Sequence, residues 1–275
     1  MNIGVIGMGL IGGSLAKAIS ENTSHTVLGF DKNESVICRA KLLGAIKEEF
    51  SLQNPSCCDI IILALYPDDT IAVFKEIAPL LKPGTAVIDC AGVKEYVCER
   101  IRPVAKEYGI NFIGGHPMAG IEKIGFDYSN KELFKDASMI LTPYADTDIK
   151  TLAEVKKLFE SVGFGTTTIV SPREHDEVIA YTSQLAHILS SAYIKSPTAP
   201  RHHGMSAGSF KDMTRVAYLN ENMWSELFME NRENLLFEID TLIKNLSDYK
   251  SAIENEDQAG LTALLKDGRN IKENI

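Results

Sequence analysis

The chain has 275 residues, 45% of them hydrophobic, which is enough for one large or two ordinary domains with buried cores. Its formal net charge of −9 argues against a general affinity for nucleic acid or anionic lipid, because both would repel it. No apolar run approaches the roughly 20 residues of a membrane helix, the start does not resemble a signal peptide, and five scattered cysteines predict reduced thiols rather than disulfides or a zinc site, so we expect a cytoplasmic protein.

Short β-branched runs alternate with helical patterns through the first half of the chain, which is typical of a parallel sheet covered by helices. The helical patterns cover 10–19, 68–81 and 93–108, and the last of them ends at Gly109. The apolar runs predict strands over 3–7, 26–31, 59–65, 85–89 and 111–114, and two further runs over 138–142 and 166–170 predict strands that close the domain.

The pattern changes at Ser171, which suits a helix N-cap because Pro172 takes the first helical position and Glu174 the capping-box position. Mostly helical patterns follow over 173–194, 222–246 and about 250–265, and 197–208 is a loop rich in helix breakers. We therefore predict an α/β fold: a Rossmann-type, mostly parallel dinucleotide-binding domain over 1–170, then an all-helical domain over 171–275. By analogy, such a second domain supplies a substrate wall and a subunit interface.

A glycine motif, Gly7-x-Gly9-x-x-Gly12, stands between the first predicted strand and helix. Glycines there allow a tight turn and let backbone N–H groups approach a pyrophosphate at the helix N-terminus. Asp31 ends the second predicted strand, where its carboxylate can bind an adenosine ribose and would repel a 2′-phosphate, so NAD is favoured over NADP. The alternatives are glycines that only permit close packing and an Asp31 that caps the next helix.

Ligands of open parallel sheets bind at the carboxyl ends of the strands. One strong general base is expected there, His116, whose ordinary pKa of about 6.5 suits proton transfer near neutrality. A histidine that only caps a strand end is the alternative, but the glycines and Pro117 around His116 indicate a specially shaped loop. Cys90 could be a nucleophile, yet the sequence offers it no nearby base, which favours a buried structural thiol. The residues expected at these strand ends are Gly7, Asp31, Tyr66-Pro67, Cys90-Ala91-Gly92 and His116.

Over nearly its whole length the chain resembles the prephenate and arogenate dehydrogenases of tyrosine biosynthesis. The blocks around His116 and before Arg215 are the most specific to that family, whereas the glycine motif occurs in many reductases. The blocks that carry the resemblance are 7–14, 89–94, 116–123, 141–143, His175-Asp176, 183–187 and 210–215.

The resemblance implies NAD-dependent oxidative decarboxylation of prephenate to 4-hydroxyphenylpyruvate, a step of aromatic amino acid biosynthesis. NAD accepts hydride from ring carbon C4, His116 takes the hydroxyl proton, and loss of carbon dioxide aromatises the ring without a metal. Arogenate, which would give tyrosine, is the alternative substrate. Two other functions stay open: a two-domain NAD(P)-dependent reductase of the β-hydroxyacid type, with Lys195 or Lys211 as its catalytic lysine, and a nucleotide-sensing protein that has lost catalysis.

The resemblance also implies which residues line the site. Arg215 would hold a substrate carboxylate with its planar fork of donors, and His187, Gly208 and Trp224 would belong to the substrate pocket. The alternatives are a surface arginine, an interhelical histidine, a plain turn and a core tryptophan. The implied cofactor contacts are Gly7, Gly9, Leu10, Ile11, Gly12, Asp31, Leu65, Tyr66, Pro67 and Gly92.

Three positions depart from the family pattern. Many relatives carry serine in place of Gly92 and serine or threonine in place of Ile121, so water, Ser183 or Tyr181 would have to supply the missing hydroxyls. Gln184 stands where histidine is frequent. We also expect a homodimer built through the helical domain, because its long helices need more apolar cover than one subunit provides.

Overall fold

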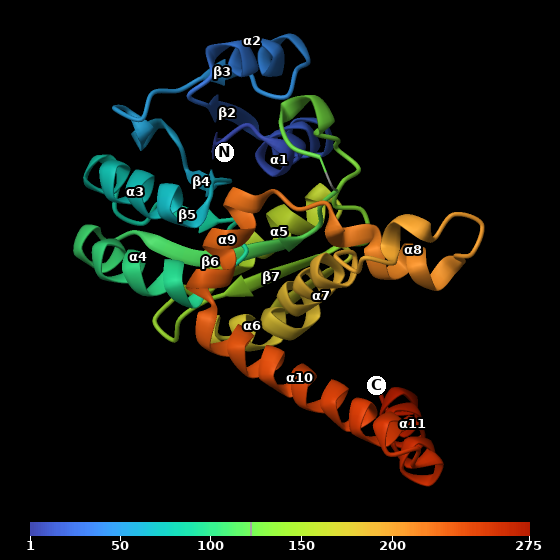
Figure 1. Cartoon of the computed structure of the whole chain (residues 1–275). Helices are drawn as coiled ribbons and strands as arrows, with labels where there is room; N and C mark the ends of the chain where they lie inside the picture. The colour runs from blue at the N-terminus through green and yellow to red at the C-terminus, as the bar shows by residue number, and fades with distance from the viewer. Residues whose placement is uncertain (122) are drawn as a thin grey trace.

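The computed structural model describes residues 1–121 and 123–275, so Glu122, which belongs to the 116–123 block, lies outside the described residues. A sheet with the strand order β3-β2-β1-β4-β5-β6-β7-β8 occupies the first part of the chain (Figure 1). Strands β1 to β6 run parallel, β7 is antiparallel to β6, and β8 is parallel to β7. The strands are β1 (Asn2–Ile6), β2 (Thr26–Phe30), β3 (Glu48–Glu49), β4 (Ile60–Leu63), β5 (Ala86–Asp89), β6 (Asn111–Met118), β7 (Ser138–Thr142) and β8 (Thr166–Ile169).

Helices cover both faces of this sheet, which confirms the predicted α/β architecture. In β4, Ile60 and Ile62 point into one core and Ile61 and Leu63 into the other, and burial on both faces explains the uninterrupted apolar run. One layer consists of α1 (Leu10–Asn22), α2 (Glu34–Leu42) and α5 (Ile149–Val162), and the other of α3 (Pro67–Ile77) and α4 (Glu95–Tyr108). Short 3₁₀ turns lie at Pro55–Cys57, Ala78–Leu80 and Phe126–Tyr128.

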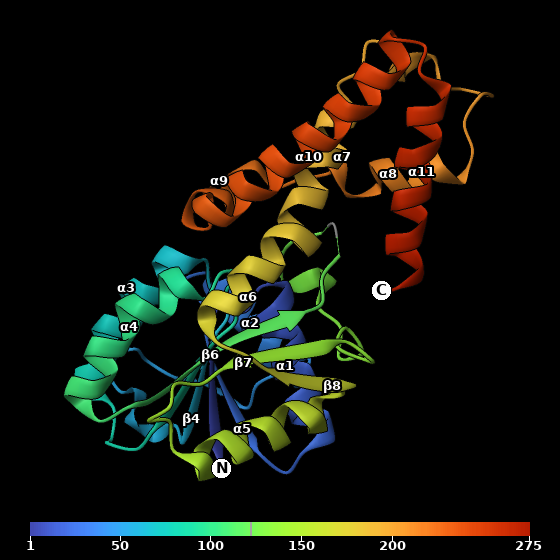
Figure 2. The same ribbon diagram turned by 90° about the horizontal axis from the view of Figure 1, so that it is seen from below.

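The chain after β8 is helical, as predicted, and Figure 2 shows it beyond one end of the sheet, with α10 and α11 projecting away. Ser171 caps the first helix by accepting a hydrogen bond from the Glu174 N–H at 3.1 Å. In the described parts of the chain, no helix is long and apolar enough to cross a membrane. The helices are α6 (Pro172–Ile179), a π-helical segment (Ala180–Leu185), α7 (Ala186–Tyr193), α8 (Gly208–Thr214), α9 (Glu221–Glu230), α10 (Arg232–Glu254) and α11 (Gln258–Glu273), with 3₁₀ turns at Ala199–Arg201 and Arg215–Ala217.

The prediction that strand 111–114 ends before His116 is wrong. Strand β6 continues to Met118 because it pairs with β7, and His116 lies opposite Ile140. Glycine and proline residues in this stretch indicated a loop, but a proline is tolerated in a strand where no ladder N–H is needed. His116 therefore sits inside a paired strand, on a more rigid support than a loop would give.

Two helix predictions were also wrong. The helix predicted over 222–246 breaks at Asn231, whose backbone is not helical and whose side chain bonds to neighbouring helices. The helix predicted over 250–265 is two helices joined by a turn. Helix α10 runs on to Glu254, and Asp257 caps α11 by accepting from the Gly260 N–H. A domain boundary between 170 and 171 remains a prediction.

Candidate active site

The glycine loop between β1 and α1 has the shape that the motif predicts. Gly7 adopts a φ of +88°, which side-chain-bearing residues rarely adopt, and a Cβ on Gly12 would stand 1.9 Å from the Gly7 carbonyl oxygen. A Cβ on Gly9, in contrast, would meet nothing within 4 Å. The backbone is therefore tightly packed at both ends of the loop and open at its middle, where a ligand can approach the main chain.

This loop fits a dinucleotide. The helix α1 begins at Leu10, and its first-turn N–H groups have no side-chain cap within the described residues, so they are available to a phosphate. Leu65 packs against the loop, since a Cβ on Gly7 would lie 2.7 Å from its Cδ2. Tyr66 and Pro67 form the N-cap and first residue of α3 next to it.

Asp31 lies just beyond β2, where the ribose of a dinucleotide is expected. Its Oδ2 accepts a hydrogen bond from the Met8 N–H at 2.8 Å, and its Oδ1 accepts one from the Asn33 N–H at 2.9 Å. The next helix is capped by Asn33, not by Asp31. Each carboxylate oxygen has a second lone pair, so Asp31 can fix the glycine loop and still accept ribose hydroxyls.

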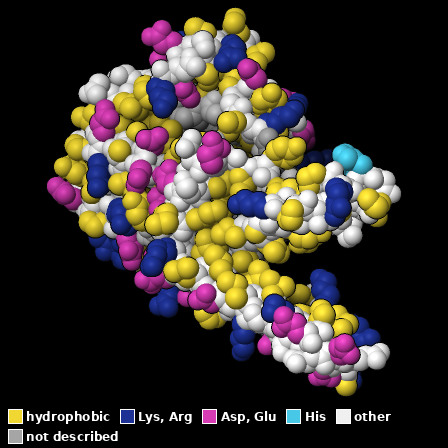
Figure 3. Space-filling view, in the orientation of Figure 1, with side chains coloured by type: hydrophobic (Ala, Val, Ile, Leu, Met, Phe, Trp, Pro, Cys, Tyr) yellow, Lys and Arg dark blue, Asp and Glu magenta, His cyan; other side chains and the backbone are white. Residues whose placement is uncertain are grey.

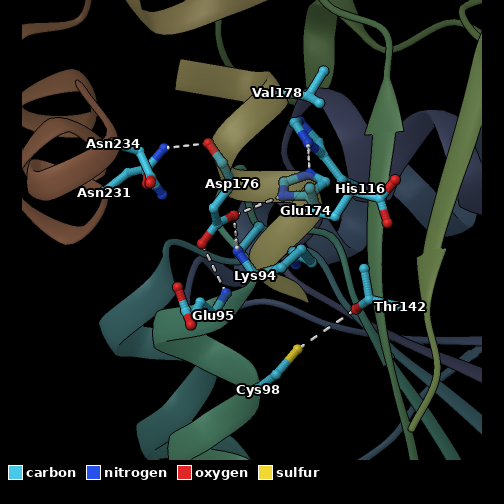
Figure 4. A network of polar contacts seen from close by, with 12 residues as sticks. Lys94, Glu95, Cys98, His116, Thr142, Glu174, Asp176, Val178, Asn231 and Asn234 are labelled. Atoms are coloured by element: carbon cyan, nitrogen blue, oxygen red, sulfur yellow. Dashed lines mark hydrogen bonds and ion pairs between the residues drawn. The ribbon is translucent and has the colours of Figure 1, made fainter. Parts of the chain in front are cut away.

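His116 meets a second histidine from the helical part of the chain. Its Nδ1 lies 2.8 Å from Nε2 of His175 on α6, and Nδ1 of His175 lies 2.6 Å from Oδ1 of Asp176. We name this chain of side chains, His116–His175–Asp176, the imidazole relay. The base comes from β6, whereas both partners come from α6, so the two parts of the molecule complete it together (Figure 4).

Asp176 is held by groups from three directions. Its Oδ1 and Oδ2 accept hydrogen bonds from the backbone N–H groups of Lys94 and Glu95, both at 2.8 Å, at the N-terminus of α4. Its own carbonyl oxygen accepts from Nδ2 of Asn231 at 2.8 Å (Figure 4). A carboxylate that accepts these hydrogen bonds is fixed in place.

The relay determines which nitrogen of His116 has a lone pair that could accept a proton. An ionised carboxylate only accepts hydrogen bonds, so His175 carries its proton on Nδ1 and presents a bare Nε2. That bare nitrogen accepts from Nδ1–H of His116, which leaves the His116 Nε2 lone pair unprotonated. Among the described residues, no hydrogen bond to Nε2 is present, and this nitrogen can accept a substrate proton.

The surroundings of the relay keep both imidazoles neutral. Burial first, then the neighbouring His175 and the charge of Lys94, lower the pKa of His116 well below its ordinary value. Burial also lowers the pKa of His175, although the hydrogen bond to Asp176 opposes this shift. A neutral His116 at physiological pH is a proton acceptor, as a general base must be.

Gly92 stands directly beside the free nitrogen of His116. A Cβ at this position would lie 4.0 Å from Nε2 of His116 and 3.3 Å from Cδ2 of Leu227. A serine here could therefore bring its hydroxyl to the base, and in this chain the Leu227 side chain of α9 takes part of that space. Gln184 has a structural role instead: it donates to the Leu227 carbonyl and accepts from Asn231.

The proposed substrate residues lie on the helical part of the chain. His187 packs against Trp224 with a ring-centroid distance of 3.9 Å and ring planes tilted by 31°, and its Nδ1 lies 2.8 Å from the carbonyl oxygen of Ser183. Arg215 is exposed and begins a 3₁₀ turn that packs against α7, the helix of His187. Gly208 is the first residue of α8 and is exposed. The structure thus brings His187 and Trp224 together and places Arg215 on an element next to them.

Several side chains proposed as alternatives lack the surroundings that catalysis would need. Burial and the neighbouring Asp89 raise the pKa of the Cys90 thiol, so the reactive thiolate is disfavoured. Lys195 and Lys211 are exposed, and so are Tyr181 and Ile121. The two lysines are open to solvent, whereas a catalytic lysine is usually desolvated in a pocket.

Sequence reasoning missed the roles of four residues that surround the base: His175, Asp176, Lys94 and Asn231. The resemblance contains the first three in its blocks but gives them no role. One signal was available, because a His-Asp pair in the first turns of a helix, followed by apolar residues, puts two titratable groups on a helix face that packs inward. Nothing in the sequence indicates that this face meets β6.

The fold and the site define a class: a two-domain protein with a dinucleotide-type sheet and a buried, neutral histidine beside the carboxyl ends of its strands. Two family profiles match this chain, one for the nucleotide-binding domain of prephenate dehydrogenase over residues 15–167 and one for its dimerization domain over residues 171–267. The chain belongs to the prephenate dehydrogenase family.

Individual relatives agree with this family. A cyclohexadienyl dehydrogenase of Zymomonas mobilis is 32% identical, over 93% of this chain and 89% of that protein. A crystal structure of prephenate dehydrogenase from A. aeolicus, in complex with hydroxyphenyl propionate and NAD+, has a TM-score of 0.86 and 30% identity, covering 100% of this chain and 98% of that one. The crystal structure of Synechocystis arogenate dehydrogenase has a TM-score of 0.85 and 26% identity, covering 100% and 99%.

Proposed function

We propose that this protein is an NAD-dependent dehydrogenase that converts prephenate to 4-hydroxyphenylpyruvate in tyrosine biosynthesis. The observation that carries the proposal is the unprotonated Nε2 of His116, held by the imidazole relay beside Gly92 at the carboxyl end of β5. Ligands of open parallel sheets bind at this edge. A base at that place can serve a substrate that lies next to a dinucleotide.

The reaction needs a hydride acceptor, a proton acceptor and an exit for carbon dioxide. Bound NAD supplies the hydride acceptor for C4 of the ring. Nε2 of His116 takes the C4 hydroxyl proton, and the relay stabilises the imidazolium that forms, because Nδ1–H then donates a charge-assisted hydrogen bond to His175. The C1–carboxylate bond breaks, its electron pair passes through the ring to the C4 oxygen, carbon dioxide leaves, and the C4 oxygen of the aromatic ring regains the proton held by His116.

The chain has groups suited to hold NAD. The open backbone at Gly9 and the N-terminus of α1 suit the pyrophosphate, and Asp31 suits the ribose. Leu10, Ile11 and Gly12 continue this loop into the helix, whereas the segment 65–67 follows β4 and Gly92 follows β5, the next strands of the sheet after β1. A carboxylate at position 31 favours NAD over NADP, since it would repel a 2′-phosphate.

We propose that the substrate is held from the helical side. His187 and Trp224, already packed together, offer an aromatic wall, and Arg215 offers a guanidinium group to a carboxylate. Gly208 would allow the backbone at the start of α8 to come close to that site. These assignments rest on the family blocks and on the packing of the Arg215 turn against α7.

One set of assays tests both the substrate and the cofactor. Purified protein is given prephenate or arogenate with NAD or NADP, and formation of the reduced nicotinamide is followed by absorbance together with release of carbon dioxide. We expect the highest kcat/KM with prephenate and NAD. Preferential turnover of arogenate would make the protein an arogenate dehydrogenase, and turnover of simple β-hydroxyacids with neither cyclohexadiene accepted would refute the proposal.

We also propose a homodimer formed through the helical domain, in the cytoplasm. Figure 3 shows hydrophobic side chains gathered along α10 and the adjoining helical region. The exposed ones include Phe237, Ile243, Leu246 and Ile253 on α10 and Leu265 on α11, and a face of this kind is expected to be covered by another subunit. Sedimentation equilibrium should give twice the 30.2 kDa of one chain, and a monomer at micromolar concentration would contradict the dimer.

A further inference from the structure

Lys94 and Asp89 form an ion pair that is completely buried, with no exposed side-chain area on either residue. Buried ion pairs usually contribute little to stability, because removing two charges from water costs about as much as their attraction returns. A lysine in such a place therefore suggests a role other than stabilisation. Its contacts indicate which role.

The ion pair binds the backbone of Gly115, the residue that precedes His116. Lys94 Nζ donates a hydrogen bond to the carbonyl oxygen of Gly115 at 2.7 Å, and Oδ1 of Asp89 accepts one from the Gly115 N–H at 3.1 Å. Both backbone groups of Gly115 are thus bound by the pair. His116 follows directly, so its backbone position depends on these two hydrogen bonds.

The same lysine also holds the other end of the imidazole relay. Its backbone N–H donates to Oδ1 of Asp176 at 2.8 Å, the oxygen that also receives the hydrogen bond from His175. Lys94 therefore contacts the first domain through its side chain and the helical domain through its main chain. Lys94 thus links the two ends of the relay.

The charges around the relay fit this role. The groups that act on the pKa of His116 are His175 and Lys94, and those that act on His175 are Asp176, Lys94 and Asp89. Asp176 and Asp89 favour a protonated His175, whereas Lys94 disfavours protonation of both imidazoles. The ammonium group of Lys94 thus opposes protonation of the two imidazoles by solvent before a substrate binds.

We propose that Lys94 is the positioning residue of the proton-transfer step: it fixes His116 against Asp176 and keeps both imidazoles uncharged until the substrate arrives. The inference rests on the proposed function, since it assigns a task within that reaction. Lys94 itself is completely buried and contacts Asp89, Gly115 and Asp176. It acts through His116.

Three variants test this role. Lys94→Met keeps the length of the side chain, and the double variant Asp89→Asn/Lys94→Met also removes the Asp89 carboxylate that would otherwise lose its partner. Lys106→Met is the control. Lys106 lies on the same helix, α4, and its ion pair with Asp146 at 2.6 Å is exposed. Lys94→Met leaves a single buried charge without its partner, which is strongly destabilising. If this variant fails to fold, the double variant is used for the test instead.

The first readout is the protonation of His116 in the free protein, followed by NMR of ¹⁵N-labelled histidine over a pH series and assigned with His116→Asn. The second is the acid limb of kcat/KM for prephenate, which reports the same base. We expect both to move to higher pH when the ammonium group is lost, and to stay in place in Lys106→Met.

The two readouts separate the inference from the proposed function. A lower kcat with an unmoved titration of His116 would mean that Lys94 is only structural, and the inference would be wrong. A shifted titration in a protein that does not turn over prephenate would uphold the effect of Lys94 on His116 and overturn the proposed reaction instead.

Discussion

Replacing His175 by phenylalanine removes the middle of the imidazole relay without touching the substrate side. Nε2 of His175 lies 2.8 Å from Nδ1 of His116, and this hydrogen bond becomes one to a charged donor when His116 takes up a proton. Such a hydrogen bond contributes roughly 1.5–3 kcal/mol. Because about 1.4 kcal/mol of barrier is a factor of ten in rate, we expect kcat to fall by about 10- to 150-fold.

The effect should be confined to kcat. His175 is only 2% exposed, so the KM for prephenate should stay within about a factor of two. His175→Gln should recover part of the rate, since its amide oxygen can accept from Nδ1–H of His116. The assay is steady-state formation of reduced nicotinamide, with circular dichroism and the melting temperature to confirm folding.

His25 provides the matched control, because it is a half-buried histidine between α1 and β2, at the end of the sheet away from the site. His25→Phe should leave kcat unchanged. If His175→Phe folds normally and retains the wild-type kcat, the relay has no part in proton transfer. A rise in KM with unchanged kcat would place His175 in substrate binding instead.

Three further predictions follow from other contacts. Asp31→Ala should reduce the ratio of kcat/KM for NAD over NADP, because the charge that repels a 2′-phosphate is lost, and an unchanged ratio would remove Asp31 from the cofactor site. Arg215→Ala should raise the KM for prephenate by about tenfold or more, given roughly 1.5–3 kcal/mol for a charged hydrogen bond; a loss in kcat alone would exclude a binding role. Burial and then the neighbouring Glu226 raise the pKa of Glu230 from 4.5 to about 8, so the folded protein keeps a proton that the unfolded chain releases, and stability should fall as pH rises through this range. Denaturant titration should show that Glu230→Gln flattens this fall, whereas parallel curves would mean that Glu230 is already ionised in the fold.

The elements that depend on local pattern could be predicted from the sequence. The strands of the first half and the cap at Ser171 follow from alternating or continuous apolar runs and from capping residues, which act over a few positions. The glycine motif is equally local, since Gly7 and Gly12 are required by the turn that they themselves form. These features therefore agree with the structure.

The features that depend on contacts between distant segments could not be predicted in the same way. Strand β6 extends to His116 only because β7 pairs with it, and the helical pattern over 222–246 breaks only because the side chain of Asn231 is needed by Asp176 and Gln184. The relay has the same origin: His116 and His175 are on different domains, and no periodicity joins them. His116 could be singled out by its chemistry, but its orientation could not.

His116→Asn tests most directly whether the imidazole at this position is the base. The amide keeps a similar size and can still accept a hydrogen bond, but it cannot take up a proton. With saturating prephenate and NAD, kcat should fall by a factor of about 10²–10⁴ while KM changes little. A folded His116→Asn protein whose kcat stays within twofold of the wild type would contradict this assignment.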